Sequence, residues 1–142
     1  HIDRETAYTN GLINFAIVRS PYARFESCYR HFKYPKDDVQ SFGSRKAKFH
    51  PVWSPDDFLD HIEKVFAKGK IGNKHYSKQS WFIPEPERLD HVIKLENLVK
   101  NWPFDFSPPN FVSNPTTRVW NIKYNKDKLQ HLYAEDFNAF GY

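Results

Sequence analysis

The sequence predicts an α/β domain with few strands and many helices. Two short apolar, β-branched runs, at residues 12–18 and 91–95, have the composition of buried strands. Stretches with helical apolar spacing lie between and after them, and this order is typical of α/β domains. The 142 residues are enough for one domain with a core and too few for two. We therefore expect a single domain over residues 1–142 with a short parallel sheet.

The first strand and the helix after it are the best-defined elements. The apolar run over residues 12–18 ends abruptly at Arg19. Ser20 is a good N-cap and Pro21 suits the first helical position, so a helix is predicted over residues 21–34. The apolar face of this helix carries Tyr22, Phe25, Tyr29 and Phe32. Its opposite face carries Ser20, Arg24, Ser27 and His31.

Start and stop signals place the remaining elements. Acidic residues mark first turns, glycine marks a helix end, and clustered prolines mark loops. The expected order is a polar loop (35–54), a helix from Ser54 to Gly69, an irregular stretch (70–88) with a helical turn near 76–81, a strand (91–95), a short helix (96–102), a proline-rich loop (103–115) and a helix capped by Asn125. The inward face of the last helix carries Leu129, Leu132, Tyr133 and Phe137.

Composition excludes several classes of protein. Aromatic residues make up 18% of the chain, which is too many for a disordered one. The single cysteine, Cys28, excludes an internal disulfide framework and any multi-cysteine zinc site. The histidines are scattered, so no metal is expected, and no apolar run is long enough for a membrane-spanning helix. The net charge of +4 suits a polyanionic ligand, but alone it does not indicate nucleic-acid binding.

The turn between the first strand and the first helix is the most informative place in the sequence. The strand delivers Arg19 to the end of the sheet, where the N–H groups of the helix N-terminus converge. A guanidinium matches phosphate geometry, and Ser27, about two helical turns on, offers a hydroxyl. These residues predict a phosphate or sulfate site. The alternative is that Arg19 pairs with a carboxylate and that Ser27 is only a small residue packed on the sheet.

The same segment resembles a known motif. Residues 15–30 read FAIVRSPYARFESCYR and closely resemble the pattern F-x-x-V-R-D-P-x-x-R-x-x-S-x-Y-R. That pattern is the 3′-phosphate-binding motif of the carbohydrate sulfotransferase family, which includes membrane-type and related bacterial enzymes. The resemblance implies that Arg19 and Ser27 hold the 3′-phosphate of 3′-phosphoadenosine 5′-phosphosulfate (PAPS). Ser20 stands where the family usually has aspartate, and because both residues cap helices well we expect the geometry to survive.

Weaker similarities follow in the same order along nearly the whole chain. The resemblance implies a P-loop-NTPase-like sulfotransferase fold, and it places Arg118, in an N-x-S/T-like loop at 114–118, near the cofactor. Three further segments look like family motifs: NKHYSKQ (73–79) like H-aromatic-x-x-Q, DHVIKLENL (90–98) like D-x-I-x-x-x-E-N-L, and YAEDFNAFGY (133–142) like Y-x-x-D-F-x-x-F-G-Y.

The resemblance also has a gap. The family needs an upstream loop, between its first strand and first helix, that cradles the 5′-phosphosulfate with backbone amides and one lysine. No such segment precedes residue 12. Residues 69–74 are rich in glycine and lysine but lack the P-loop spacing, so we interpret them as a helix stop and a basic loop. Because the chain also lacks methionine, we expect it to be the C-terminal part of a sulfotransferase, without the N-terminal strand–loop–helix.

Sulfuryl transfer needs a base for the acceptor, and two histidines are candidates. His1 is the only histidine upstream of the phosphate motif, and HIDRETA (1–7) looks similar to a segment of bacterial relatives; the alternative is a frayed or tag-derived end. His75 is the second candidate, with Gln79 one turn away if that stretch is helical; the alternative is an ordinary surface histidine. Glu96 is expected to anchor a loop or an arginine rather than to take part in catalysis.

Three functions are compatible with these observations. The leading one is a sulfotransferase that moves a sulfuryl group from PAPS to a hydroxyl of an acceptor, with a carbohydrate as the acceptor class that the family suggests, and without a metal. The second is a non-catalytic nucleotide- or polyanion-binding module that retains only the 3′-phosphate site, which the missing upstream loop favours. A nucleic-acid-binding domain is the weakest, because lysines and aromatic residues do not gather on one predicted face.

Overall fold

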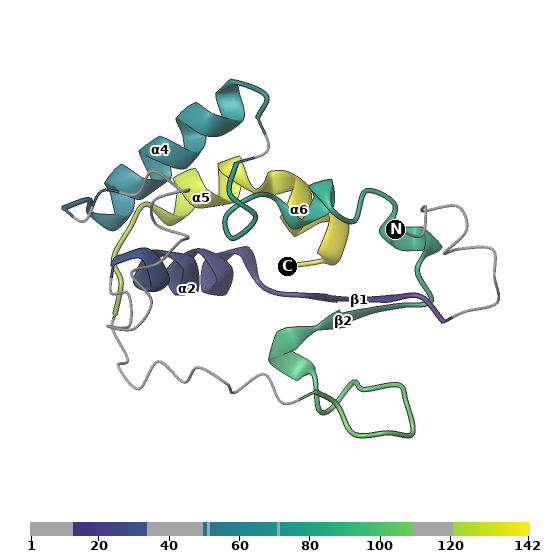
Figure 1. Cartoon of the computed structure of the whole chain (residues 1–142). Coiled ribbons are helices and arrows are strands. Elements are labelled where there is room, and N and C mark those ends of the chain that lie inside the picture. The colour runs from purple at the N-terminus through teal and green to yellow at the C-terminus, as the bar shows by residue number, and fades with distance from the viewer. Residues whose placement is uncertain (1–12, 34–49, 51, 71, 110–120) are drawn as a thin grey trace.

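The computed structural model describes residues 13–33, 50, 52–70, 72–109 and 121–142, and within them the chain is a mixed α/β structure (Figure 1). The strands are β1 (Phe15–Val18) and β2 (His91–Lys94), and the helices are α2 (Pro21–Lys33), α4 (Pro55–Ala67), α5 (Lys126–Leu132) and α6 (Ala134–Phe140). In Figure 1, β1 runs directly into α2, α5 lies between α2 and α4, and α6 returns the C-terminus to the end of β1.

The two strands form a parallel sheet, which confirms the short parallel sheet predicted from the sequence. The register pairs Phe15 with His91 and Val18 with Lys94. At the start of the sheet, the Asn14 carbonyl accepts the Asp90 and His91 N–H groups at 2.9 and 3.3 Å. Because the strands are parallel, their carboxyl ends meet at one edge, and the chain leaves β1 there directly into α2.

Helices α2 and α4 supply most of the core. The predicted apolar face of α2 is confirmed, because Phe25, Tyr29 and Phe32 are buried and Tyr22 packs at the margin. The core residues of α4 have no exposed surface: Phe58, Leu59 and Ile62. Burying one such side chain contributes about 1.5–3 kcal/mol, so this helix pair fixes the position of α2 and of the β1–α2 junction.

The predicted start and stop of α4 are confirmed in atomic detail. The Asp57 N–H donates to the Ser54 hydroxyl at 3.1 Å, and the Ser54 N–H donates to the Asp57 carboxylate at 2.8 Å. These hydrogen bonds from Ser54 hold the pKa of the Asp57 carboxyl below its usual value. After Ala67 the chain turns at Gly69, whose φ of +63° favours glycine.

The last predicted helix is broken at Tyr133, which corrects the expectation of one continuous helix after Asn125. The Asn125 side chain caps α5 as predicted, by accepting the Lys128 N–H at 2.9 Å. Tyr133 has φ −108° and ψ 22°, and its buried hydroxyl donates to the Tyr76 carbonyl. The predicted inward face is nevertheless confirmed, since Leu129, Tyr133 and Phe137 are buried and Leu132 is partly buried.

The helix expected over 96–102 does not form. Leu95–Asn97 makes one 3-10 turn (η3), and one further bond follows, from the Asn101 N–H to the Asn97 carbonyl at 2.9 Å. Two asparagines and a β-branched valine in this stretch disfavour a helix, and the proline at 103 disfavours helical geometry at Trp102. The helical turn expected near 76–81 is a 3-10 helix, η1 (Gln79–Trp81), and a further one, η2, covers Pro86–Arg88.

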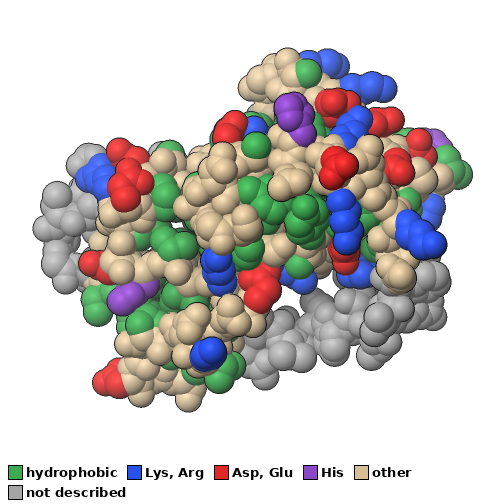
Figure 2. All heavy atoms as spheres, turned by 180° about the vertical axis from the view of Figure 1, so that it is seen from behind, with side chains coloured by type: hydrophobic (Ala, Val, Ile, Leu, Met, Phe, Trp, Pro, Cys, Tyr) green, Lys and Arg blue, Asp and Glu red, His purple; other side chains and the backbone are tan. Residues whose placement is uncertain are grey.

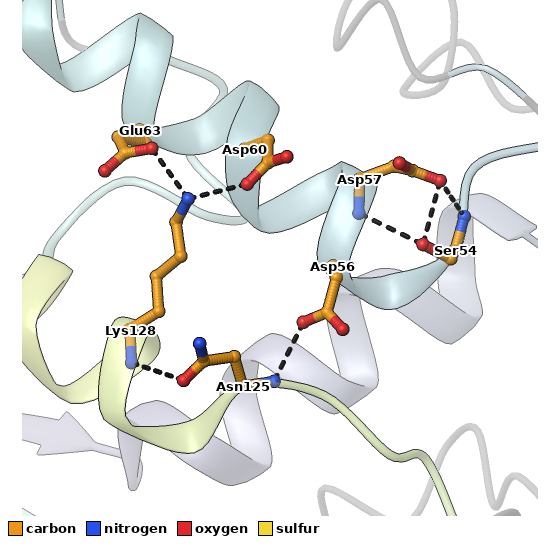
Figure 3. A network of polar contacts seen from close by, with 7 residues as sticks. All are labelled: Ser54, Asp56, Asp57, Asp60, Glu63, Asn125 and Lys128. Atoms are coloured by element: carbon orange, nitrogen blue, oxygen red, sulfur yellow. Dashed lines mark hydrogen bonds and ion pairs between the residues drawn. The ribbon is translucent and has the colours of Figure 1, made fainter.

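Helices α4 and α5 are joined by a network of paired charges (Figure 3). The Lys128 ammonium lies between the carboxylates of Asp60 and Glu63, at 2.6 and 2.7 Å. Asp56 accepts the N–H of Asn125, the residue that caps α5, at 2.8 Å. The acidic side chains of α4 drawn in Figure 3 are therefore all occupied within the fold.

The surface seen in Figure 2 mixes both signs of charge, with blue and red side chains interspersed over the helices. Hydrophobic side chains show at the lower left, over the sheet and the loop after β2. The large apolar residues exposed around the sheet and that loop are Ile13, Phe15, Val92, Val99 and Phe106. Among the described residues, no helix is long and apolar enough to cross a membrane.

Candidate functional site at the β1–α2 junction

The main chain of Arg19 is held from both sides by one side chain. The Arg19 N–H donates to Gln79 Oε1 at 2.9 Å, and Gln79 Nε2 donates to the Arg19 carbonyl at 2.8 Å. The buried Gln79 amide therefore acts as a one-residue strand partner at the carboxyl end of β1. This pair fixes where the Arg19 side chain leaves the backbone.

Gln79 is in turn held by a buried carboxylate. The N–H groups of Gln79 and Ser80 donate to the two oxygens of Asp136, both at 2.8 Å. Asp136 has no exposed surface, so these bonds provide the compensation that a buried carboxylate needs. The connection runs from α6 through η1 to the end of β1, and it joins segments far apart in the sequence.

The first amide after Arg19 has an anionic partner. The Ser20 N–H donates to Glu96 Oε1 at 2.7 Å, and the Tyr142 hydroxyl donates to Glu96 Oε2 at 2.9 Å. Glu96 is therefore an anchor, as predicted, but an exposed one that holds the turn and the C-terminal tyrosine rather than an arginine. Lys94 completes this side, with its ammonium 2.5 Å from the Gly141 carbonyl and 4.5 Å from the centre of the Tyr142 ring.

The guanidinium of Arg19 behaves differently from its backbone. Among the described residues, no carboxylate pairs with it and no acceptor bonds to it. The charge of Arg19 acts on the Tyr142 phenol. Burial and the hydrogen bond to Glu96 raise the pKa of that phenol, and Arg19 partly opposes the rise. The alternative in which Arg19 pairs with a carboxylate therefore has no support from the described residues.

Helix α2 begins two residues after Arg19, at Pro21. Pro21 has no N–H group, and the Arg24 N–H is bonded to the Ser20 carbonyl at 2.9 Å. The N–H groups of Tyr22 and Ala23 take no acceptor among the described residues. A guanidinium and two first-turn amides, all without acceptors in the described part of the chain, are the kinds of donor that a tetrahedral oxyanion requires.

Ser27 lies two turns along α2 from this end. It is half-buried, and its hydroxyl has no hydrogen-bond partner among the described residues. Arg24, one turn before it, is occupied: its guanidinium donates to the Ser77 carbonyl and, at 2.8 Å, to the Lys74 carbonyl. Of the two arginines at this end of α2, Arg24 therefore anchors the loop before η1, while the Arg19 guanidinium has no acceptor among the residues that the structure describes.

His75 lies apart from Gln79, which corrects the helical spacing considered for them. Residues 74–76 form a turn that is closed by the Ser77 N–H on the Asn73 carbonyl at 2.9 Å, and Lys78 is extended at ψ 137°. The imidazole of His75 lies instead beside that of His31, with ring centres 5.6 Å apart. Its role as an acceptor base stays a prediction.

Two predicted site residues, His1 and Arg118, lie outside the described residues, as does most of the predicted polar loop. In the described part of the chain, no group of three or more His, Cys, Asp or Glu side chains could hold a metal ion. The glycine- and lysine-rich stretch at 69–74 begins with the helix stop at Gly69, and a side chain at Gly72 would overlap the Tyr76 ring, at 2.4 Å from its nearest atom.

Sequence reasoning identified the donors of this site but not the residues that position them. Gln79 and Asp136 are both fixed letters in the family-like segments at 73–79 and 133–142, and that was the available signal. Comparison of the chain with family models, with curated proteins and with solved structures finds no match.

Proposed function

We propose that this chain is part of a PAPS-dependent sulfotransferase and that the β1–α2 junction holds the 3′-phosphate of the nucleotide. One observation carries the proposal: the backbone of Arg19 is fixed by Gln79, while its guanidinium takes no acceptor among the described residues. An arginine held in this way, at the carboxyl end of a parallel strand and the start of a helix, is suited to bind a phosphate. The sulfotransferase motif over residues 15–30 supports a nucleotide as its carrier.

The proposed reaction moves a sulfuryl group from PAPS to an acceptor hydroxyl, with a carbohydrate as the acceptor class. The bond between sulfur and the bridging oxygen of the 5′-phosphate breaks, and a bond from sulfur to the acceptor oxygen forms. The acceptor proton passes to a base, and 3′-phosphoadenosine 5′-phosphate leaves. In this proposal the residues of the β1–α2 junction bind and orient the nucleotide, which places the reacting groups in line. We propose as well that the chain has the P-loop-NTPase-like fold of sulfotransferases.

Equilibrium binding of two nucleotides tests the site. The chain is titrated with 3′-phosphoadenosine 5′-phosphate and with adenosine 5′-monophosphate, which lacks the 3′-phosphate. We expect Arg19→Ala to weaken binding of the first on the order of 30-fold, since charge-assisted bonds contribute about 2 kcal/mol, and to leave the second nearly unchanged. Ser27→Ala gives a smaller loss of the same kind.

Arg88→Ala is the matched control, because Arg88 lies in η2 and its guanidinium is paired with Glu85 at 3.0 Å. It should leave both affinities unchanged. If Arg19→Ala weakens both nucleotides equally, or neither, Arg19 does not hold the 3′-phosphate and the proposed function fails.

A specific observation favours a second candidate, a non-catalytic nucleotide- or polyanion-binding module. The stretch with glycine and lysine at 69–74 ends α4 and packs Gly72 against the Tyr76 ring, which is not the form of a phosphate cradle. Turnover of a labelled sulfate donor separates the two candidates. Release of 3′-phosphoadenosine 5′-phosphate with label on the acceptor supports the enzyme, and binding without turnover supports the module.

A further inference from the structure

A second group of cationic side chains lies beside α2, on the face that carries Arg24, Ser27 and His31. The turn at 73–77 packs along this face, because the Arg24 guanidinium donates to the Lys74 and Ser77 carbonyls. This packing brings His75 to His31, with ring centres 5.6 Å apart and ring planes 32° apart. Arg24, His31, Lys74 and His75 are named here the histidine-pair cluster.

In the part of the chain that the structure describes, the histidine-pair cluster has no paired carboxylate. Among the described residues, none of the four side chains forms an ion pair with a carboxylate. The bonds of Arg24 go to neutral carbonyl groups, which hold the guanidinium without cancelling its charge. Lys74, His31 and His75 are exposed, so a ligand can reach them from solvent.

The cluster already affects the protonation of His75. Partial burial, and then the charges of His31, Lys74 and Arg24, lower the pKa of the His75 imidazole. The charged groups that act on it come from α2 and from its own turn, and all of them are cations. Another ring neighbour is Phe32, whose edge-on ring centre lies 6.0 Å away. Cationic neighbours make an imidazole a weaker proton acceptor and a stronger attractor of anions.

We propose that the histidine-pair cluster binds a tetrahedral oxyanion, a sulfate or phosphate group, with uptake of protons by the two histidines. A dianion bound beside the two rings supplies a counter-charge that the described residues do not provide, and imidazolium and ammonium groups donate charge-assisted hydrogen bonds to it. Binding and protonation are then reciprocal: the anion favours the charged histidines, and acid favours the anion. This site goes beyond the proposed function, because it does not include Arg19.

Histidine resonances in NMR report both halves of this proposal. The full chain is titrated from acid to neutral pH without and with inorganic sulfate, with chloride at equal ionic strength as the reference. We expect sulfate to raise the pKa of His75 by about one unit, which corresponds to a tenfold tighter complex when His75 is charged. Sulfate affinity then decreases steadily as the pH rises.

Inorganic phosphate forms the second arm of the experiment. Phosphate loses charge in acid while the histidines lose charge as the pH rises, so its binding passes through a maximum. The tighter of the two anions identifies the group that the cluster prefers. A pKa of His75 that responds equally to sulfate, phosphate and chloride would overturn the proposal.

Variants of exposed residues separate this site from the nucleotide site. Lys74→Gln and His31→Gln should each weaken sulfate binding at least threefold at acidic pH, and the remaining histidine resonances show that the fold is retained. His131→Gln, on the exposed side of α5, is the matched control and should have no effect. Arg19→Ala should leave sulfate binding here intact, so failure of the nucleotide site and failure of this one are distinguishable. Unchanged sulfate affinity in both Lys74→Gln and His31→Gln would also overturn the proposal.

Discussion

The α4–α5 contact and the β1–α2 junction use charge in opposite ways. At the first, the Lys128 ammonium lies between two carboxylates. At the second, the buried Asp136 carboxylate and the Gln79 amide hold backbone groups, and the Arg19 guanidinium is left without a partner among the described residues. The difference indicates that charges paired with one another join helices, whereas hydrogen bonds to backbone groups position a cation for a ligand.

The largest effect is expected from Asp136→Ala. The buried N–H of Gln79 and the partly buried N–H of Ser80 would lose their acceptors, and we expect the free energy of unfolding in urea to fall by about 3 kcal/mol. Asp136→Asn keeps one acceptor oxygen and should lose less. The control is Asp105→Ala, an exposed loop residue that should stay within about 0.5 kcal/mol of wild type. Equal effects at both positions would show that the buried carboxylate is not a structural anchor.

Gln79 tests whether the anchor and the ligand site are connected. Gln79→Ala removes both bonds to the Arg19 backbone, so we expect a loss of about 2 kcal/mol of stability and weaker nucleotide binding. Gln79→Glu retains an acceptor for the Arg19 N–H but no donor for the Arg19 carbonyl. Its stability should therefore lie between those of wild type and Gln79→Ala. Nucleotide affinity is measured by titration calorimetry at a temperature where each variant is folded. Unchanged affinity in a destabilised Gln79→Ala would separate the anchor from the site.

Lys128 tests the other region. Lys128→Ala should cost about 1 kcal/mol of unfolding free energy, since each exposed ion pair contributes little and the ammonium has two partners. The cost should shrink in about 1 M salt, where screening is strong. Lys123→Ala, an exposed lysine without an ion pair among the described residues, is the control. A cost that does not depend on salt would mean that the Lys128 stem, rather than its charge, joins the helices.

The smallest effect is a pH dependence from His75. Because burial and nearby cations lower its pKa in the folded chain, the unfolded chain binds the proton more readily. The contribution of His75 to stability is therefore present above the ordinary histidine pKa, near 6.5, and is lost as the pH falls below that value. Urea denaturation between about pH 8 and pH 5 should show a shallower decline for His75→Gln than for wild type. A steeper decline in the variant would mean that folding raises the pKa of His75 rather than lowering it.

Local sequence patterns predicted the elements that depend on local chemistry. Pro21 after the β1 run, the helix start at Ser54, and Gly69 as a stop each depend on interactions over a few residues, and each is confirmed. The break at Tyr133 was not predicted, and no local sequence signal marks it; the Tyr133 hydroxyl bonds the Tyr76 carbonyl, 57 positions away in the sequence.

The residues of the candidate site also divide into those that local sequence predicts and those that it does not. Arg19 and Ser27 were found because the strand–helix turn and its motif are continuous in sequence. The anchors of the site are contributed by residues 60 and more positions away, Gln79 and Asp136, and no periodicity joins such positions. The pairing of His31 with His75 likewise follows from packing of the 73–77 turn on α2.

The most direct test of the central claim measures the unfolding free energy of Arg19→Ala with and without 3′-phosphoadenosine 5′-phosphate. If the guanidinium is reserved for a ligand, the variant without nucleotide should match wild type within about 0.5 kcal/mol. It should also lose most of the stabilisation that the nucleotide gives wild type by binding to the folded state. A variant that is markedly less stable without nucleotide, yet is stabilised by it as much as wild type, would contradict the account.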